Sequence, residues 1–238
     1  MQFFIFVLLI CLFIFLYCVY VLSNDDFIFL RKDVTMEKLF NIIFPGSLVS
    51  LFVSRLFYGF FHAGKIFSNP LVFALFPYSP GLSLLGAVVG IGIYLVFLKS
   101  RKENLLPWAR ISDLFSIAFL ISLPIGFVGN LLFSEEIKIA KLVGAQAIAY
   151  FILFIIFLKF FLPCLLNGKF KEGTITLLSL ICFSITSLIS NAFLKISILE
   201  YFKNVENIML ILIFLISFGI LFLHESLLLK IKHNKKGK

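Results

Sequence analysis

Residues 2–22 read QFFIFVLLICLFIFLYCVYVL and contain no Asp, Glu, Lys or Arg. A run of about 20 apolar residues is long enough to cross the hydrocarbon core of a bilayer as a helix. A helix also satisfies its own backbone hydrogen bonds, which lipid does not do. The run has neither the basic start nor the small-residue cleavage site of a secretory signal. We therefore predict a retained transmembrane helix.

The same pattern recurs along the rest of the chain. Long apolar runs without strand-like alternation occupy residues 39–61, 81–98, 111–133, 145–162, 174–194 and 208–228. Of the 238 residues, 61% are hydrophobic and only 14% charged. A soluble domain carries roughly 25% charged residues, so the composition argues against a soluble enzyme, a disordered chain or a disulfide scaffold. We expect an all-α polytopic membrane protein with about seven transmembrane helices in a single domain over residues 1–228.

Basic residues are distributed unevenly between these runs. Fourteen Lys and Arg residues lie in one set of connecting segments and the C-terminal end, whereas five lie in the other set. Basic segments remain on the cytoplasmic side of a membrane, so we predict an outside N-terminus and a cytoplasmic C-terminus, with a basic tail over residues 229–238. The net charge of +9 follows from these segments. We predict no nucleic-acid partner, because a basic surface with polar support is missing.

Polar residues inside the predicted spans are candidates for function because their burial in lipid is costly. Arg55 has two open interpretations: it extends to the interface or pairs with a carboxylate, or it binds a phosphate or carboxylate ligand. Asn130 has two as well: it bonds a neighbouring helix or a lipid headgroup. For Asp113 we expect a charge that favours the dipole of its own helix. Glu225 is expected to extend to the inner interface.

Small residues open the third predicted span. We interpret Gly86, Gly90 and Gly92 as a face for close helix contact. Gly81 and Ser83 lie at the start of that helix, where backbone N–H groups are able to hold an anion. The sequence shows no catalytic triad, phosphate loop or metal-ligand spacing. We therefore predict neither a metal nor a cofactor.

Several of these residues belong to short motifs that follow one another in a recognisable order. The motifs are VTMEKLF at 34–40, VSRLFY at 53–58, NPL at 69–71, GLSLLG at 81–86, ARISD at 109–113 and GFVGNLLFSE at 126–135, followed by Gln146. In this order they resemble the prolipoprotein diacylglyceryl transferase family. GLSLLG is similar to the family's G-M-S-F-H-G motif, and GFVGNLLFSE is similar to its signature G-R-x-G-N-F-x-N-G-E. The resemblance covers residues 34–150.

The resemblance implies a membrane enzyme that moves diacylglyceryl from phosphatidylglycerol to the lipobox cysteine thiol of a prolipoprotein. It implies a site open to the outer leaflet of a bacterial cytoplasmic membrane. By the same resemblance, Arg55, Ser83, Asn130 and Glu135 bind the lipid substrate, while the catalytic residues stay unassigned. The partners expected on this basis are phosphatidylglycerol, the prolipoprotein signal peptide and the membrane itself.

The chain departs from the family at three motif positions. Leu85 stands at the motif histidine, Phe127 at the signature arginine and Phe133 at the second signature asparagine. These replacements keep open an alternative: a catalytically degenerate member of the family that binds a lipid or a protein partner. A small-solute transporter is a further alternative. It predicts helices broken at the membrane midplane, for which only the region of Pro124 offers a sign.

Overall fold

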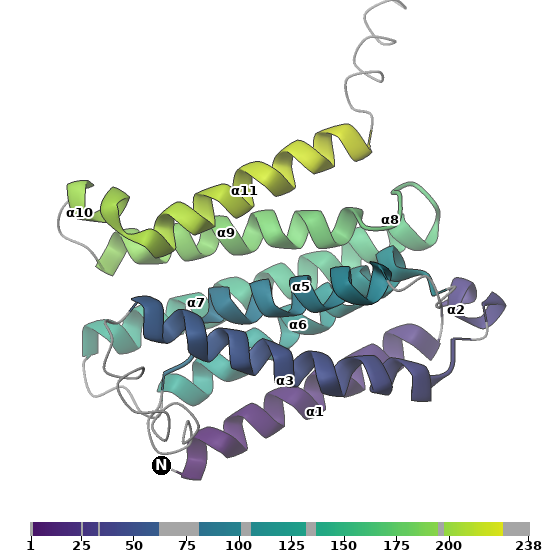
Figure 1. Cartoon of the computed structure of the whole chain (residues 1–238), viewed down its shortest axis with the longest axis horizontal. Coiled ribbons are helices and arrows are strands. Elements are labelled where there is room, and N and C mark those ends of the chain that lie inside the picture. The colour runs from purple at the N-terminus through teal and green to yellow at the C-terminus, as the bar shows by residue number, and fades with distance from the viewer. Residues whose placement is uncertain are drawn as a thin grey trace, which may run out of the picture. The chain divides into compact units, whose positions relative to one another are not determined.

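Helices make up all the regular secondary structure in the described residues. The structure, a computed structural model, describes residues 2–24, 26–32, 34–61, 81–100, 106–131, 137–194 and 198–225. In chain order (Figure 1) the elements are α1 (Gln2–Asn24), α2 (Phe27–Arg31), α3 (Met36–Phe61), α5 (Leu84–Ser100), α6 (Trp108–Leu131), α7 (Ile137–Ile156), the π-helix η1 (Phe157–Phe161), α8 (Leu162–Leu166), α9 (Thr174–Leu194), α10 (Ile198–Lys203) and α11 (Val205–His224). The prediction of an all-α protein is confirmed.

Six helical segments in the described part of the chain are long and apolar enough to cross a membrane. They are α1, α3, α6, α9 and α11, together with the segment Ala140–Leu166 that runs through α7, η1 and α8. The remaining predicted span forms the shorter apolar helix α5 (Leu84–Ser100). A multi-pass membrane protein is therefore supported, whereas the count of seven spans and the sidedness of the termini stay predictions.

The helices fall into two compact units, Met1–Trp108 and Ala109–Lys238. In the first unit, α3 and α5 run antiparallel and approach each other closely (Figure 1). A Cβ atom added at Gly86 would lie 2.8 Å from Ser54 Cα, and one added at Gly90 would lie 3.0 Å from Ser50 Cα. Small residues on both helices let the two backbones meet.

Side-chain hydrogen bonds reinforce this contact. Ser50 Oγ donates to the carbonyl oxygen of Ala87 over 2.9 Å. At the far end of the interface, a Cβ on Gly46 would lie 3.0 Å from Tyr94 Cδ1. Gly92 behaves differently, because nothing lies within 4 Å of the position of its Cβ. The prediction of a close-contact role is thus confirmed for Gly86 and Gly90 and is wrong for Gly92.

In the second unit, α9 lies between α7 and α11, and bonds of its side chains reach both helices. The first half of α6 is the most deeply buried stretch, with Ile111, Ile117 and Ala118 fully inaccessible. Pro124 lies inside α6 without ending the helix. The sign of a broken helix that would favour a transporter is therefore not found at this position.

We predict that Gly86→Ala destabilises the first unit while Gly92→Ala does not. The new Cβ on residue 86 would lie 2.7 Å from Phe57 Cβ and 2.8 Å from Ser54 Cα, so the helices must separate. Overpacking of this kind costs about 1–3 kcal/mol. At Gly92 the space is open, and the higher helix propensity of alanine leaves stability unchanged or slightly raised. Unfolding in detergent micelles compares the variants, and equal stabilities would contradict the packing described here.

Candidate functional site

Arg55 is buried in α3, within two turns of the end of that helix. Its side chain is 3% exposed, and its Nη1 donates to the carbonyl oxygen of Gly81 over 2.7 Å. Gly81 lies just before α5, so the bond joins two of the motifs that carry the family resemblance. The guanidinium is thereby held at the start of a helix, at the end of α3 that we predict to face outside.

Ser54 and Ser83 form a second link at the same place. Ser54 Oγ donates to the carbonyl oxygen of Ser83 over 2.7 Å, and the Ser83 N–H donates to the carbonyl oxygen of Ser54 over 3.2 Å. Ser83 Oγ in turn accepts from the Gly86 N–H over 3.2 Å, as a helix N-cap does. Ser83 thus shapes the start of α5, and its predicted contact with a lipid substrate stays a prediction.

Gly81 has a backbone conformation and a setting that only glycine fits. Its φ is +155°, and a Cβ would lie 2.2 Å from Cε1 of Tyr58. A side chain here would collide with the tyrosine ring and move the carbonyl that holds Arg55. The first glycine of the GLSLLG motif is therefore explained by its own backbone conformation and by its contact with Tyr58.

The chain differs from the motifs of the family that it resembles at three positions. The two of these positions that the structure describes hold packed apolar side chains. Leu85 is 2% exposed and carries no group that transfers protons. Phe127 stacks on Tyr150, with ring centroids 5.6 Å apart and planes 7° apart. Phe133 lies outside the described residues. The ring of Phe127 packs α6 against α7 and supplies no charge for a phosphate.

Two of the four predicted lipid-binding residues, Arg55 and Ser83, come together at the α3–α5 contact. Asn130 is exposed at the last turn of α6, in the second unit. Glu135 lies outside the described residues. The binding of one lipid by both Arg55 and Asn130 therefore stays a prediction.

A row of polar side chains along α9 connects three helices of the second unit. Thr186 Oγ1 donates to Tyr150 Oη over 2.8 Å. At Ser190, one turn after Thr186 on α9, the side-chain oxygen accepts from Gln146 Nε2 of α7. Next to it, Asn191 Nδ2 donates to Asn207 Oδ1 over 2.8 Å. This row was not predicted from the sequence, although Thr186 and Ser190, which are four positions apart on α9, share one face of the helix.

Asp113 binds a different helix from the one that the sequence suggested. Its side chain is fully buried, and its Oδ2 accepts from the Gly173 N–H over 2.6 Å. Its Oδ1 accepts from the Thr176 N–H over 2.8 Å and from Thr176 Oγ1 over 2.9 Å. The expectation that Asp113 serves its own helix was wrong: the carboxylate caps the start of α9, where its charge favours the helix dipole.

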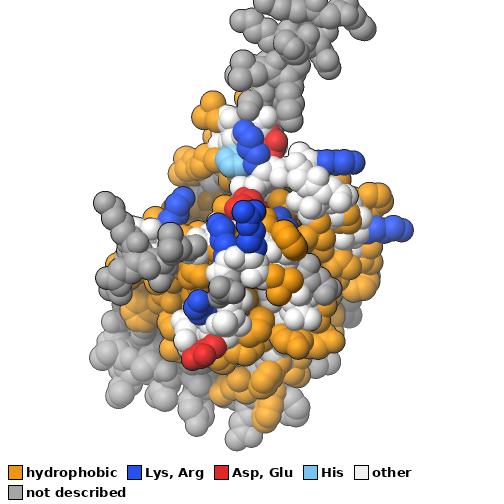
Figure 2. All heavy atoms as spheres, turned by 90° about the vertical axis from the view of Figure 1, so that its right-hand side faces the viewer, with side chains coloured by type: hydrophobic (Ala, Val, Ile, Leu, Met, Phe, Trp, Pro, Cys, Tyr) orange, Lys and Arg blue, Asp and Glu red, His pale blue; other side chains and the backbone are white. Residues whose placement is uncertain are grey.

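Glu225 holds the same segment from the end of α11. The expectation that it extends to the interface was wrong, because the side chain is buried. Its Oε1 accepts from the Lys171 N–H over 3.0 Å and from Thr174 Oγ1 over 2.6 Å. Lys171 Nζ also donates to the carbonyl oxygen of His224. Figure 2, which views the molecule from the right-hand side of Figure 1, shows a histidine and charged side chains amid hydrophobic ones.

Within the described ranges, no group of three or more His, Cys, Asp or Glu side chains is arranged to hold a metal ion. Comparisons of the chain with protein-family models, curated proteins and solved structures found no match.

We predict that Asp113→Asn lowers the stability of the second unit by about 2–3 kcal/mol. The amide retains the shape of the carboxylate but loses the charge and one acceptor, and a hydrogen bond to a charged group contributes roughly 1.5–3 kcal/mol. Unfolding in detergent micelles measures the loss. Glu172→Gln, in the loop that precedes α9, is the matched control and should leave stability near that of the wild type. A wild-type stability of Asp113→Asn would contradict the capping role.

Proposed function

We propose that the chain is a membrane transferase that moves diacylglyceryl from phosphatidylglycerol to the lipobox cysteine thiol of a prolipoprotein. One observation carries the proposal. Two motifs of the resemblance, at residues 53–58 and 81–86, pack against each other through the Arg55–Gly81 and Ser54–Ser83 bonds. Motifs of one lipid site are expected to lie side by side, as these two do.

The chemistry gives Arg55 a specific role in this proposal. The thiol sulfur attacks the glyceryl carbon that bears the phosphate, a C–S bond forms, and the C–O bond to phosphate breaks. Glycerol phosphate leaves with the electron pair, and the thiol proton passes to a base. Negative charge grows on the departing phosphate, so a fixed guanidinium lowers the barrier. The bond to Gly81 fixes the guanidinium before substrate arrives.

The side of the membrane on which we place the site follows from the distribution of basic residues along the chain. Arg55 lies toward the end of α3 that is remote from the basic segment containing Lys38. If basic segments face the cytoplasm, Arg55 is at the depth of the outer leaflet. Lipoprotein precursors with a cysteine beside a membrane-spanning signal present the thiol at that depth. The bacterial cytoplasmic membrane is accordingly the proposed location.

A second candidate function is binding of the same lipid without transfer. It is favoured by Leu85 and Phe127, which place packed apolar side chains where the family has a histidine and an arginine. In this alternative, Arg55 still binds the phosphate of the lipid, but the thiol is not activated. The chain then retains or presents a lipid, or a lipoprotein precursor, to a partner.

We predict that labelled peptide forms in vesicles that contain the purified protein, labelled phosphatidylglycerol and a lipobox peptide. Arg55→Ala should lower the rate of transfer about 10²–10³-fold, which is the usual effect of losing a donor that stabilises transition-state charge. Lys203→Gln, which removes a positive charge from α10, is the control and should retain the rate.

A parallel measurement of phosphatidylglycerol retained by the detergent-purified protein separates the two candidates. Lipid retention that depends on Arg55, with no transfer by the wild type, would replace the transferase proposal with the binding one. Neither transfer nor Arg55-dependent retention would overturn both.

A further inference from the structure

The short helix α2 is held firmly in the turn that joins α1 to α3. The side chain of Phe29 is buried, and its carbonyl oxygen accepts from the Val34 N–H over 3.0 Å. At the start of the helix, Asp26 Oδ1 accepts from the Ile28 N–H over 2.9 Å. The orientation of α2 in the first unit is thus fixed by one buried ring and by bonds at both of its ends.

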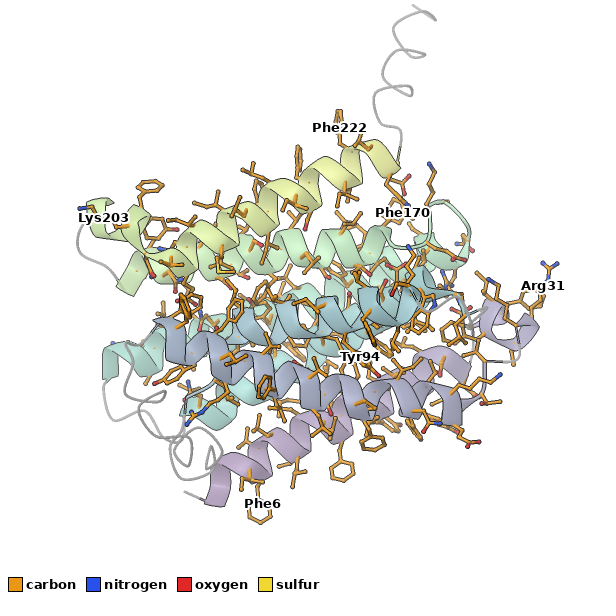
Figure 3. The ribbon with its side chains drawn as sticks, in the orientation of Figure 1. Phe6, Arg31, Tyr94, Phe170, Lys203 and Phe222 are labelled. Carbon is orange, nitrogen blue, oxygen red and sulfur yellow. The ribbon has the colours of Figure 1, made fainter. Side chains whose placement is uncertain are left out.

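The opposite side of α2 is apolar and uncovered. Phe27 is 74% exposed and Leu30 is 65% exposed. These residues are three positions apart, so they lie on one face of the helix. Arg31 and Lys32 follow directly and are exposed, and Figure 3 shows Arg31 extending outward from the tip of α2. The helix therefore presents large apolar groups and basic groups side by side.

More positive charge lies at the same end of the first unit. Lys38 is exposed in the first turns of α3, and Lys99 is exposed in the last turn of α5. Because α3 and α5 are antiparallel, these two ends are neighbours. Two acidic residues of the described part accompany them: Glu37 is exposed, while Asp26 is buried at the start of α2. Among the described residues at this end, four basic side chains are thus exposed against one exposed carboxylate, while Asp25 and Asp33, which flank α2 in the sequence, lie outside the described residues.

We propose that α2 inserts Phe27 and Leu30 into the lipid–water interface and binds anionic phospholipid headgroups through Arg31 and Lys32, with Lys38 and Lys99 adding to the local positive charge. Aromatic and aliphatic side chains beside basic ones are the composition that lies at a membrane interface. α2 is also expected to lie close to a membrane surface, because it is in the short segment between α1 and α3, which are both long enough to span a membrane. This surface is separate from Arg55 and does not depend on the proposed transfer.

The depth of α2 is tested by fluorescence. Phe27→Trp is made in a Trp108→Phe background, which leaves one tryptophan, and the protein is reconstituted into vesicles with lipids brominated either near the headgroup or near the chain ends. We expect the strongest quenching with bromine near the headgroup and little quenching by aqueous iodide. Leu48→Trp, at an exposed position near the middle of α3, is the control and should be quenched best by deep bromine.

Strong iodide quenching of the tryptophan introduced by Phe27→Trp, without quenching by lipid, would overturn the insertion of α2. If Phe27→Trp does not yield folded protein, Leu30→Trp serves the same measurement, because it lies on the same face.

The headgroup preference is tested with the same introduced tryptophan. Each basic side chain near an anionic surface contributes about fivefold to binding. Brominated phosphatidylglycerol should therefore compete with unbrominated phosphatidylcholine for the position next to this tryptophan better than brominated phosphatidylcholine does. The variant Arg31→Gln with Lys32→Gln should lose at least about fivefold of this preference, whereas Lys203→Gln should retain it. Equal quenching by the two brominated lipids, with Arg31 and Lys32 both present, would overturn the headgroup proposal.

Discussion

The first unit depends on the close backbone contact between α3 and α5. Gly86 and Gly90 remove the side chains that would keep the helices apart, and Ser54 and Ser83 exchange hydrogen bonds across the gap. The interface brings the segment before α5 within reach of Arg55, whose guanidinium binds the Gly81 carbonyl. A buried cation is costly in a membrane unless polar groups surround it. The contact supplies one of these groups from the backbone and so fixes where the charge lies.

In the second unit, buried carboxylates provide hydrogen-bond partners for the N–H groups at the start of a helix. The start of α9 has N–H groups that no earlier turn satisfies, and such groups are costly when they are buried. Asp113 from α6 and Glu225 from the end of α11 bind this start and the loop that precedes it. The two acidic residues therefore join three helices at one end, and their burial is explained without a catalytic role.

Much of the fold was predictable because the relevant signals are local. Apolar run length identified the six long helices, and the small residues of GLSLLG with Gly90 identified a close contact. Partners that lie far away in sequence were not predictable in this way. Asp113 lies in the second turn of α6, near the start of its own helix, yet it binds Gly173 and Thr176, which are 60 and 63 positions later. Gly92 is two positions after Gly90, outside the four-residue spacing of Gly86 and Gly90, and so lies on another face of α5.

For the candidate site, Arg55 and Ser83 lie at the same α3–α5 contact, and the lipid that each is predicted to bind stays a prediction. Ser83 caps α5, a role that its position before an apolar helix was sufficient to predict. Phe127 is packed on Tyr150, and no sequence pattern indicated this stack. The central claim concerns a single contact, between the Arg55 guanidinium and the phosphate of a lipid.

Solid-state NMR measures that contact most directly, as the dipolar dephasing of arginine side-chain ¹⁵N signals by ³¹P in bilayers that contain phosphatidylglycerol. Because the chain contains three other arginines, the informative quantity is the difference between the wild type and Arg55→Lys. The proposed site predicts a strongly dephased guanidinium signal that disappears in Arg55→Lys. Identical dephasing in both proteins would contradict a phosphate at Arg55.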